Sequence, residues 1–399
     1  MKKFFIVITS IMCITSLFAC SHPKANNQPS VIEPQLPAGA VTFDYQQHLY
    51  FDVILRDSIS ARMIFDTGNT HLLLDSTFYA TTIGNKNLRK TMLQGAGGGI
   101  EMAHIDASGW DYRVGAKSQK GQMAVVINLR KILGEGVDGM FGMKYMQGER
   151  VEFCYEKGYM RLLATDEVIG NDYIRVSCKW LDDNKMRILM PFSITLPDGY
   201  TYEGDFLVDM GMSGTLALNS NTARVLKQNK HLPNARRMAY TVGGVGGSRV
   251  EYVFKAQQVT IGGKAIKDVR AVWNENEQGA MADTRYAGII GNDLLARFDV
   301  IYDFAGCAIY LRPNNKFNAQ QANDLGIALT PMSNYWIVNG LLEGGNAEQA
   351  GLRRGDRIET INDIRINDAN ANRLYPLPEK LTLSVQRENG TMEIVVYRE

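Results

Sequence analysis

The hydrophobic residues of this chain are grouped in short runs that turn residues interrupt at close intervals. Between residues 41 and 313, many of these runs alternate apolar and polar side chains. Such alternation is typical of half-buried β-strands, whereas amphipathic helices repeat their apolar positions every three to four residues. Helical patterns are few, and residues 222–226 and 292–297 predict short helices. The pattern therefore predicts an all-β fold for this part of the chain.

Two of the apolar runs end in the same type of turn. The run MIFD ends at Asp66 and continues as Thr-Gly-Asn-Thr, and the run FLVD ends at Asp209 and continues as Met-Gly-Met-Ser. A further apolar run follows each turn within a few residues. In an isolated Asp-x-Gly turn, the aspartate commonly caps its own backbone. Two such turns in matching contexts indicate instead that two carboxyl groups meet in one symmetric site.

The two turns belong to an internal repeat. Each half begins with β-rich sequence, carries its Asp-x-Gly turn and a glycine-rich stretch, and closes with an apolar strand, a glycine and a hairpin. These features recur in the same order at a nearly constant offset, which predicts a duplicated β-lobe. The glycine-rich stretches, which are either plain hairpin tips or flexible flaps, include Gly95, Gly97 and Gly98 in the first half and Gly244 and Gly246 in the second.

In order and spacing, these features resemble the bilobed aspartic proteases, the pepsin-like and retropepsin-like superfamily. The resemblance covers about residues 41–313 and implies a two-lobed β-barrel domain, with an N-terminal lobe over residues 41–166 and a C-terminal lobe over residues 167–315. It implies that Asp66 and Asp209 are the catalytic pair and that the glycine-rich stretches are flaps over the cleft. The supporting residues that it places around the pair are Thr67, Gly68, Thr70, Gly211 and Ser213.

Such a pair of carboxyl groups can hydrolyse a peptide bond without a metal or a covalent intermediate. Two carboxyls about 3 Å apart share one proton, because two negative charges at that distance repel each other. The ionised group acts as general base on water, while the protonated group donates a hydrogen bond to the substrate carbonyl. Gly68 and Gly211 let backbone N–H groups approach each carboxylate. Thr70 and Ser213 supply hydroxyls that are expected to hold the outer carboxylate oxygens.

One position departs from the family pattern. The residue after each catalytic aspartate is usually Thr or Ser, whose hydroxyl ties the two turns together; Thr67 keeps this group, but the thioether of Met210 is no hydrogen-bond donor. Residues 95–101 also lack the aromatic flap residue of pepsin-like enzymes. Two functions stay open: an aspartic endopeptidase, and a catalytically weak peptide-binding protein. Three other carboxylates are expected to be turn or surface residues: Asp138, Asp293 and Asp303.

A separate unit follows at residues 322–399. Residues 346–362 read NAEQAGLRRGDRIETIN, which resembles the core of a PDZ domain: a short helix that ends at Gly351, then a strand that begins at Asp356. PDZ domains bind a chain end by strand addition, with backbone N–H groups holding the terminal carboxylate. The loop that matches this carboxylate site consists of Leu325, Gly326 and Ile327. The alternative is a PDZ fold that only packs against the lobes.

The N-terminal segment has the pattern of a targeting signal. Lys2 and Lys3 precede an apolar run over residues 4–19 that is short for a membrane span. The sequence that ends at Cys20 resembles the lipobox of bacterial lipoproteins, which implies removal of residues 1–19 and a lipid anchor on Cys20. The alternative is an ordinary signal peptide. Residues 20–40 predict a polar tether, so the expected location is the bacterial cell envelope, facing the periplasm.

Composition narrows the remaining functions. The chain has 43 Lys and Arg against 42 Asp and Glu, a net charge of +1, so it has no basic excess with which to neutralise a nucleic acid. The five histidines are scattered and the cysteine spacing fits no metal site, so neither a metal nor a cofactor is expected. Cys154, Cys178 and Cys307 allow at most one disulfide. The expected partners are a peptide or protein substrate and, through Cys20, the membrane.

Overall fold

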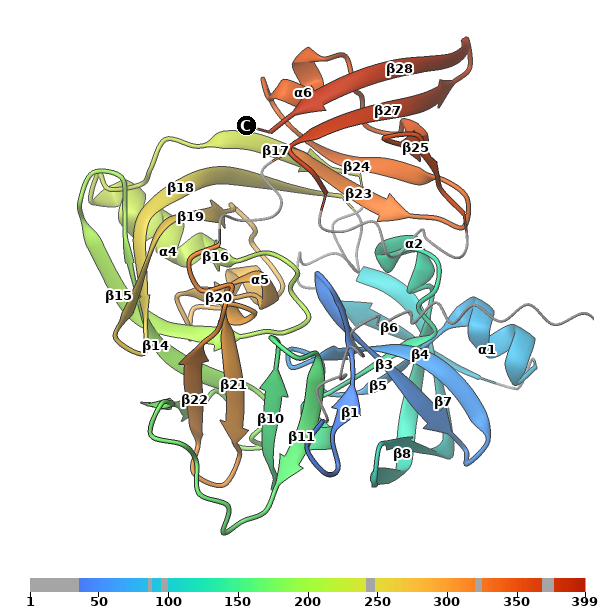
Figure 1. Ribbon diagram of the computed structural model, residues 1–399, viewed down its shortest axis with the longest axis vertical. Helices are drawn as coiled ribbons and strands as arrows, with labels where there is room; N and C mark the ends of the chain where they lie inside the picture. Colours follow the sequence, from blue (N-terminus) through green and yellow to red (C-terminus); the bar gives the residue numbers. More distant parts are fainter. Residues whose placement is uncertain are drawn as a thin grey trace, which may run out of the picture. The chain divides into compact units, whose positions relative to one another are not determined.

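The structure is a computed structural model that describes residues 36–84, 88–94, 100–241, 248–319, 325–367 and 377–398. The protein is mostly β (Figure 1): 51% of the described residues are in strands and 10% are in helices. Residues from Pro37 onward belong to one structural unit. Within the described ranges, no helix combines the length and the apolar character that crossing a membrane requires.

The first half of the chain forms a closed six-stranded barrel with two additional strands. The strands are β2 (Asp44–Gln46), β3 (His48–Leu55), β4 (Ile59–Asp66), β5 (Leu72–Asp75), β6 (Arg89–Gln94), β7 (Ile100–Val114), β8 (Lys117–Ile127) and β9 (Gly139–Gly142). The barrel follows the order β3, β4, β9, β5, β8, β7, and it closes because β3 also pairs with β7. β4, the strand that ends at Asp66, lies between β3 and β9 in this order. It runs antiparallel to β3 and parallel to β9.

The second half repeats this strand order. Its strands are β13 (Lys179–Trp180), β14 (Ile188–Thr195), β15 (Thr201–Val208), β16 (Leu216–Leu218), β17 (Arg236–Tyr240), β18 (Arg249–Ile261), β19 (Lys264–Trp273) and β20 (Gly288–Ile290). The barrel runs β14, β15, β20, β16, β19, β18, and the pairing of β14 with β18 closes it. β15 runs parallel to β20 just as β4 does to β9. The internal repeat seen in the sequence thus corresponds to two barrels of one topology.

A third sheet joins the two halves. Its strands are β1 (Val41–Thr42), β10 (Arg150–Cys154), β11 (Tyr159–Leu163), β12 (Ile174–Ser177), β21 (Phe298–Asp303) and β22 (Ala308–Pro313). The hairpin that closes each half of the repeat contributes two strands, and the hairpins meet where β10 pairs with β21, with Val151 opposite Tyr302. This shared sheet fixes the first barrel against the second.

The helices are short. They are α1 (Ser76–Thr82), α2 (Arg130–Leu133), α3 (Met143–Met146), α4 (Ser220–Gln228), the 3₁₀ turn η1 (Ala280–Ala282) and α5 (Asn292–Leu295). The two helices predicted at residues 222–226 and 292–297 are confirmed by α4 and α5.

Packed phenylalanines hold the strand ends that carry the two aspartates. Phe65, directly before Asp66, lies with its ring centre 5.1 Å from that of Phe141 on β9 and 5.2 Å from that of Phe153 on β10. In the second half, the rings of Phe206 and Phe192 lie 4.9 Å apart. All five side chains are buried. Because close-packed cores resist displacement, the strand ends before Asp66 and Asp209 are held rigidly in place.

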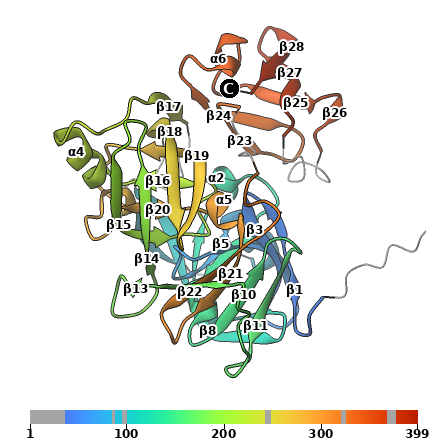
Figure 2. The same cartoon turned by 60° about the vertical axis from the view of Figure 1, so that its left-hand side comes forward.

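The C-terminal part forms a smaller β-rich unit. Its elements are β23 (Ile327–Pro331), β24 (Trp336–Leu342), α6 (Asn346–Gln349), β25 (Arg357–Ile361), β26 (Ile364–Arg365), β27 (Lys380–Arg387) and β28 (Gly390–Tyr397). It has its own core around the fully buried Trp336. β24 also pairs with β17 of the second barrel, with Ala239 opposite Leu341, so one sheet continues from the barrel into this unit (Figures 1 and 2).

The three cysteines in the described residues are free thiols. Cys154 is buried and burial raises the pKa of its thiol to about 11, which keeps it protonated near neutral pH. Cys20 lies outside the described residues, together with the predicted signal peptide and most of the tether.

Candidate functional site

The first aspartate stands at the end of a buried strand. β4 ends at Asp66, and the chain then turns so that the N–H groups of Gly68 and Asn69 donate to Asp66 Oδ1 at 2.7 and 3.1 Å. A third bond, from the Asn69 N–H to the Asp66 carbonyl at 3.2 Å, closes the turn. The carboxyl group is therefore held in one orientation by its own loop.

The second aspartate has the same local geometry. Asp209 directly follows β15, and the N–H groups of Gly211 and Met212 donate to Asp209 Oδ1 at 2.8 and 3.3 Å. The Met212 N–H also donates to the Asp209 carbonyl at 3.3 Å. Each half of the repeat thus presents one carboxyl group from an equivalent turn.

The two carboxyl groups lie against each other across the two glycines. A Cβ atom at Gly211 would lie 2.1 Å from Asp66 Cγ, and a Cβ atom at Gly68 would lie 2.8 Å from Asp209 Oδ2. Real Cβ atoms do not approach other atoms so closely, so each glycine leaves the space that the opposite carboxyl occupies. Each carboxyl group also shifts the pKa of the other, so the two interact directly. The glycines are thus required by close approach, and neither has a positive φ.

The electrostatics of the pair favour a shared proton. Burial, and after it the negative charge of Asp209, raises the pKa of Asp66 well above its usual value. Burial also raises the pKa of Asp209, although hydrogen bonds from the Gly211 N–H and from Asp66 oppose that shift. Their titration belongs to the pair rather than to either residue, because the two groups interact directly. Both residues are half-buried, so the pair stays open to the cleft.

Thr67 connects the two turns. Its hydroxyl donates to the carbonyl oxygen of Val208 at 3.0 Å and accepts from the N–H of Met210 at 2.9 Å, and the residue is fully buried. The equivalent side chain in the second half, Met210, is also fully buried and packs in the main core. The connection between the halves is therefore one-sided: a hydroxyl from the first turn and an apolar contact from the second.

We expect Thr67→Val to lower the free energy of unfolding by about 2–4 kcal/mol, because a buried carbonyl and a buried N–H would lose their shared partner. Chemical denaturation measures the change. Thr67→Ser is the matched control, since it keeps the hydroxyl and should remain close to the wild-type stability. Equal stability of the valine and serine variants would contradict a role for this hydroxyl in joining the halves.

Two predicted supporting hydroxyls are placed differently from the expectation. Thr70 and Ser213 both line the cleft, but Thr70 Oγ1 lies 3.0 Å from Nδ1 of His71. Across the described part of the chain, neither hydroxyl is found in a hydrogen bond with Asp66 or Asp209. The backbone N–H groups of the two turns supply the contacts to the carboxylates instead.

The aspartates lie in a cleft of about 850 Å³ with apolar walls from both barrels. Leu73, Val125 and Met140 line it from the first barrel, and Leu207, Val272 and Ile289 line it from the second. Each set belongs to a separate small hydrophobic cluster, so the two walls correspond in the repeat. A cleft with apolar walls and polar groups between them suits a peptide, which offers apolar side chains and a polar backbone.

The predicted flap glycines Gly95, Gly97, Gly98, Gly244 and Gly246 lie outside the described residues. The hairpins on which they would stand are described: β6 pairs with β7, and β17 pairs with β18. Leu93 of β6 and Tyr240 of β17 line the cleft. The strands that flank both glycine-rich stretches thus border the site.

A third carboxylate of the cleft was missed by sequence reasoning. Asp293, expected to be a turn or surface residue, is half-buried near the start of α5, where Tyr45 donates to its Oδ1 at 2.9 Å. Burial raises its pKa to about 6. The only sequence signal for it was its place two residues after Gly291, which lies between β20 and α5. Asp303, in contrast, is a turn residue that accepts from the Gly306 N–H at 2.8 Å.

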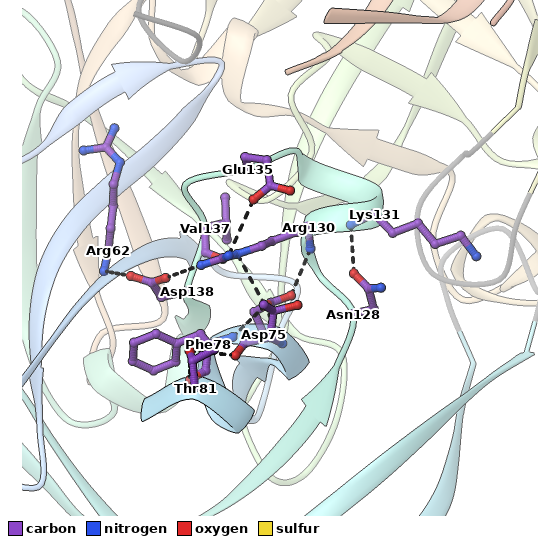
Figure 3. A network of polar contacts seen from close by, with 11 residues as sticks. Arg62, Asp75, Phe78, Thr81, Asn128, Arg130, Lys131, Glu135, Val137 and Asp138 are labelled. Carbon is purple, nitrogen blue, oxygen red and sulfur yellow. Dashed lines mark hydrogen bonds and ion pairs between the residues drawn. The ribbon is translucent and has the colours of Figure 1, made fainter. Parts of the chain in front are cut away.

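A network around Arg130 fixes the loop that borders the first wall of the cleft (Figure 3). Its guanidinium lies 3.4 Å from an oxygen of the buried Asp75, 3.0 Å from Asp138 Oδ1 and 3.5 Å from Glu135 Oε2. Asp75 also caps α1, and Asp138 accepts from the Arg62 N–H on β4. Asp138 is therefore a bracing residue, and the expectation of a turn or surface residue was wrong for it.

The predicted carboxylate loop of the C-terminal unit leads directly into β23. Leu325 is fully buried, and Gly326 has a φ of +64°, a left-handed conformation that favours glycine. The Gly326 carbonyl accepts from the Leu342 N–H at 2.8 Å, and Ile327 begins β23. All five residues of β23 line the same cleft as the two aspartates, although no local sequence pattern indicates this arrangement.

Taken together, the fold is that of a mostly β protein with a closed six-stranded barrel and a C-terminal PDZ domain. The PDZ assignment rests on a match of residues 337–387 to the PDZ domain family. No protease family was identified for the chain, and no curated protein matches it. Within the described ranges, no cluster of three or more His, Cys, Asp or Glu side chains is arranged to hold a metal ion.

Proposed function

We propose that the protein is an aspartic endopeptidase in which Asp66 and Asp209 activate water for attack on a peptide bond. The observation that carries the proposal is the contact between the two carboxyl groups across Gly68 and Gly211. A capped turn would account for each aspartate alone. It would not account for a glycine in each turn that makes room for the carboxyl of the opposite half.

The chemistry needs only groups that the chain supplies. The ionised carboxylate takes a proton from water as the oxygen attacks the scissile carbonyl, and the protonated carboxyl donates to the carbonyl oxygen. The tetrahedral intermediate collapses when the C–N bond breaks and the amine receives a proton from the pair. One water is consumed, a carboxylic acid and an amine are released, and the pair again holds one proton.

The remaining parts of the proposal concern recruitment and location. A PDZ domain implies binding of peptides or protein carboxyl ends, so it is suited to bring substrates to the cleft. Lipidation of Cys20 would anchor the protein in the bacterial cell envelope, facing the periplasm. A polar tether would then hold the catalytic part away from the bilayer surface.

A second candidate function is peptide binding with little hydrolysis, and Met210 favours it. The buried thioether supplies no second hydroxyl between the turns, so the pair is braced from one side alone. Loss of one positioning contact can lower the rate of a reaction without removing the cleft, because catalysis depends on the placement of the reacting groups to a fraction of an ångström.

Digestion of a denatured protein between pH 3 and pH 8 separates the two candidates. The full-length chain in detergent is compared with Asp66→Asn and Asp209→Asn, and mass spectrometry detects new peptide termini. The endopeptidase predicts cleavage by the wild type and none by either variant. Peptide binding without cleavage at any pH would favour the second function, and equal cleavage by all three proteins would overturn both roles of the pair.

A further inference from the structure

The PDZ domain and the two aspartates share one cleft. Ile327, Leu329 and Pro331 of β23 line the cavity that also contains Asp66 and Asp209. Since β23 directly follows the predicted carboxylate loop, a chain end that binds along this strand would lie within the same cavity as the carboxyl pair. The peptide-binding surface and the proposed catalytic site are therefore continuous.

One edge of β23 is open for an added strand. β23 pairs with β24 along one side, and no strand in the described residues pairs with its other side. Leu329 lies opposite Val338 of β24. The Val338 N–H donates to the Asp356 carbonyl, and the Val338 carbonyl accepts from the Gly355 N–H, so both groups point away from β23. In an antiparallel ladder, this makes the two residues a non-hydrogen-bonded pair, so Leu329 directs its own N–H and C=O to the open edge.

The open edge has a defined direction and a defined end. A peptide that adds antiparallel to β23 places its carboxyl end at Gly326 and its earlier residues toward Pro331. At Pro331, proline offers no N–H, and its carbonyl already accepts from the Glu135 N–H at 2.9 Å. The added strand therefore ends there, and the peptide continues past α2, whose Ile132 and Leu133 also line the cleft.

The first barrel contacts β23 directly, and the second barrel holds it through the neighbouring strand β24. On the side of the second barrel, the Thr241 N–H donates to the Asn339 carbonyl, and the Glu343 N–H donates to the Arg237 carbonyl, each at 2.8 Å. On the side of the first barrel, the Glu135 contact belongs to the loop that the Arg130 network braces (Figure 3). A strand held from two sides keeps a constant distance between the bound chain end and the aspartates.

We propose that this site acts on polypeptides held by their free carboxyl ends on β23, and that it cleaves them at a fixed distance before that end. The inference rests on the proposed function. β23 is five residues long, so the bond that is cut lies at least about five residues from the carboxyl end. Hydrolysis leaves a new carboxyl group on the long fragment and a new amino group on the short carboxyl-terminal peptide.

The test compares one peptide of about fifteen residues as the free acid and as its carboxyl-terminal amide. Both are incubated with the full-length protein, and mass spectrometry gives the cleaved bond and kcat/KM. We expect amidation to lower kcat/KM about tenfold or more, mainly through a higher KM, because a hydrogen-bonded charge is lost. Lengthening the peptide at its carboxyl end should move the cleaved bond by the same number of residues.

Leu329→Pro provides a matched variant, because it removes one N–H from the open edge. It should lower kcat/KM for the free acid by a larger factor than for the amide, and an unchanged Tm checks its folding. If free acid and amide are cut equally and Asp66→Asn abolishes both, the proposed function holds and the inference is wrong.

If neither peptide is cut, the proposed function fails, and binding to the wild type decides the inference separately. A preference for the free acid that Leu329→Pro removes would support a chain end held on β23. Equal binding of acid and amide would overturn it. A peptide with the sequence of residues 20–35 tests whether the chain's own tether occupies the site. If it displaces the bound free acid no better than unrelated amidated peptides do, the tether is excluded as the occupant. If it displaces the free acid better than they do, the assignment to substrates would be overturned.

Discussion

If the protein is the proposed endopeptidase, the Gly211→Ala substitution should abolish proteolysis. The new Cβ would lie 2.1 Å from Asp66 Cγ, so either the Asp66 side chain must rotate or the two turns must separate. Either movement breaks the contact through which the pair shares a proton. Since general acid–base catalysis contributes about 10²–10⁴-fold and depends on this contact, kcat/KM should fall by about 10³-fold or more.

Two further glycine variants make this result specific. Gly68→Ala places its Cβ 2.8 Å from Asp209 Oδ2, a milder clash, so it should reduce activity less than Gly211→Ala. Gly214→Ala in the same loop meets first the end of the Met212 side chain, at 3.2 Å, which can move aside, so its Tm should change little. Wild-type kcat/KM in Gly211→Ala would show that the two carboxyl groups need not meet.

The Asp66→Asn substitution is expected to remove activity and to raise stability at neutral pH. An amide keeps an oxygen that accepts from the Gly68 and Asn69 N–H groups, and its NH₂ can donate to an ionised Asp209. It cannot exchange a proton with water, so kcat/KM should fall by about 10³-fold. The buried negative charge and its repulsion with Asp209 are lost at the same time, so the protein should tolerate the change well.

The stability of the wild type should change with pH in a direction that the raised pKa of Asp66 determines. The pKa of Asp66 is raised on folding, so the folded state binds more protons than the unfolded state above the usual aspartate pKa. Stability of the wild type should therefore fall as pH rises from about 4 through the raised pKa of the pair. Asp66→Asn should remove much of this slope, so its Tm should exceed that of the wild type at pH 7 and converge with it near pH 3.

Thermal unfolding at pH 3, 5 and 7 measures this difference. Asp303→Asn is the matched control, because this carboxylate only caps a turn through the Gly306 N–H, and it should keep wild-type activity. The quantity to compare is the Tm of Asp66→Asn minus the Tm of the wild type. If this difference is smaller at pH 7 than at pH 3, the result would contradict a buried pair of repelling carboxyls.

The sequence was most informative where the repeat could be compared with itself. The two Asp-x-Gly turns, the parallel strands behind them and the hairpins that meet in the shared sheet all come from short local patterns that occur twice. Local patterns of this kind specify strands and turns directly, because the alternation of apolar residues fixes which face is buried. Duplication then indicated that the two turns would be brought together.

The features that were missed depend on contacts between distant parts of the chain. The pairing of β17 with β24 joins strand edges about 100 residues apart, and no local pattern records which edges meet. The same reason explains why β23 was not expected in the cleft. Asp138 was misjudged because its role depends on Arg62 and Arg130, which lie on other elements. Asp293 was misjudged because its hydrogen-bond partner, Tyr45, lies 248 residues earlier in the chain.

The pH dependence of kcat/KM for one peptide substrate tests the central claim most directly. If Asp66 and Asp209 share a single proton, activity requires the singly protonated pair, so the profile should be bell-shaped, with limbs that belong to the pair. Either Asp→Asn variant should lack this activity at every pH. A rate that rises with pH to a plateau, or one that survives in Asp209→Asn, would contradict the account.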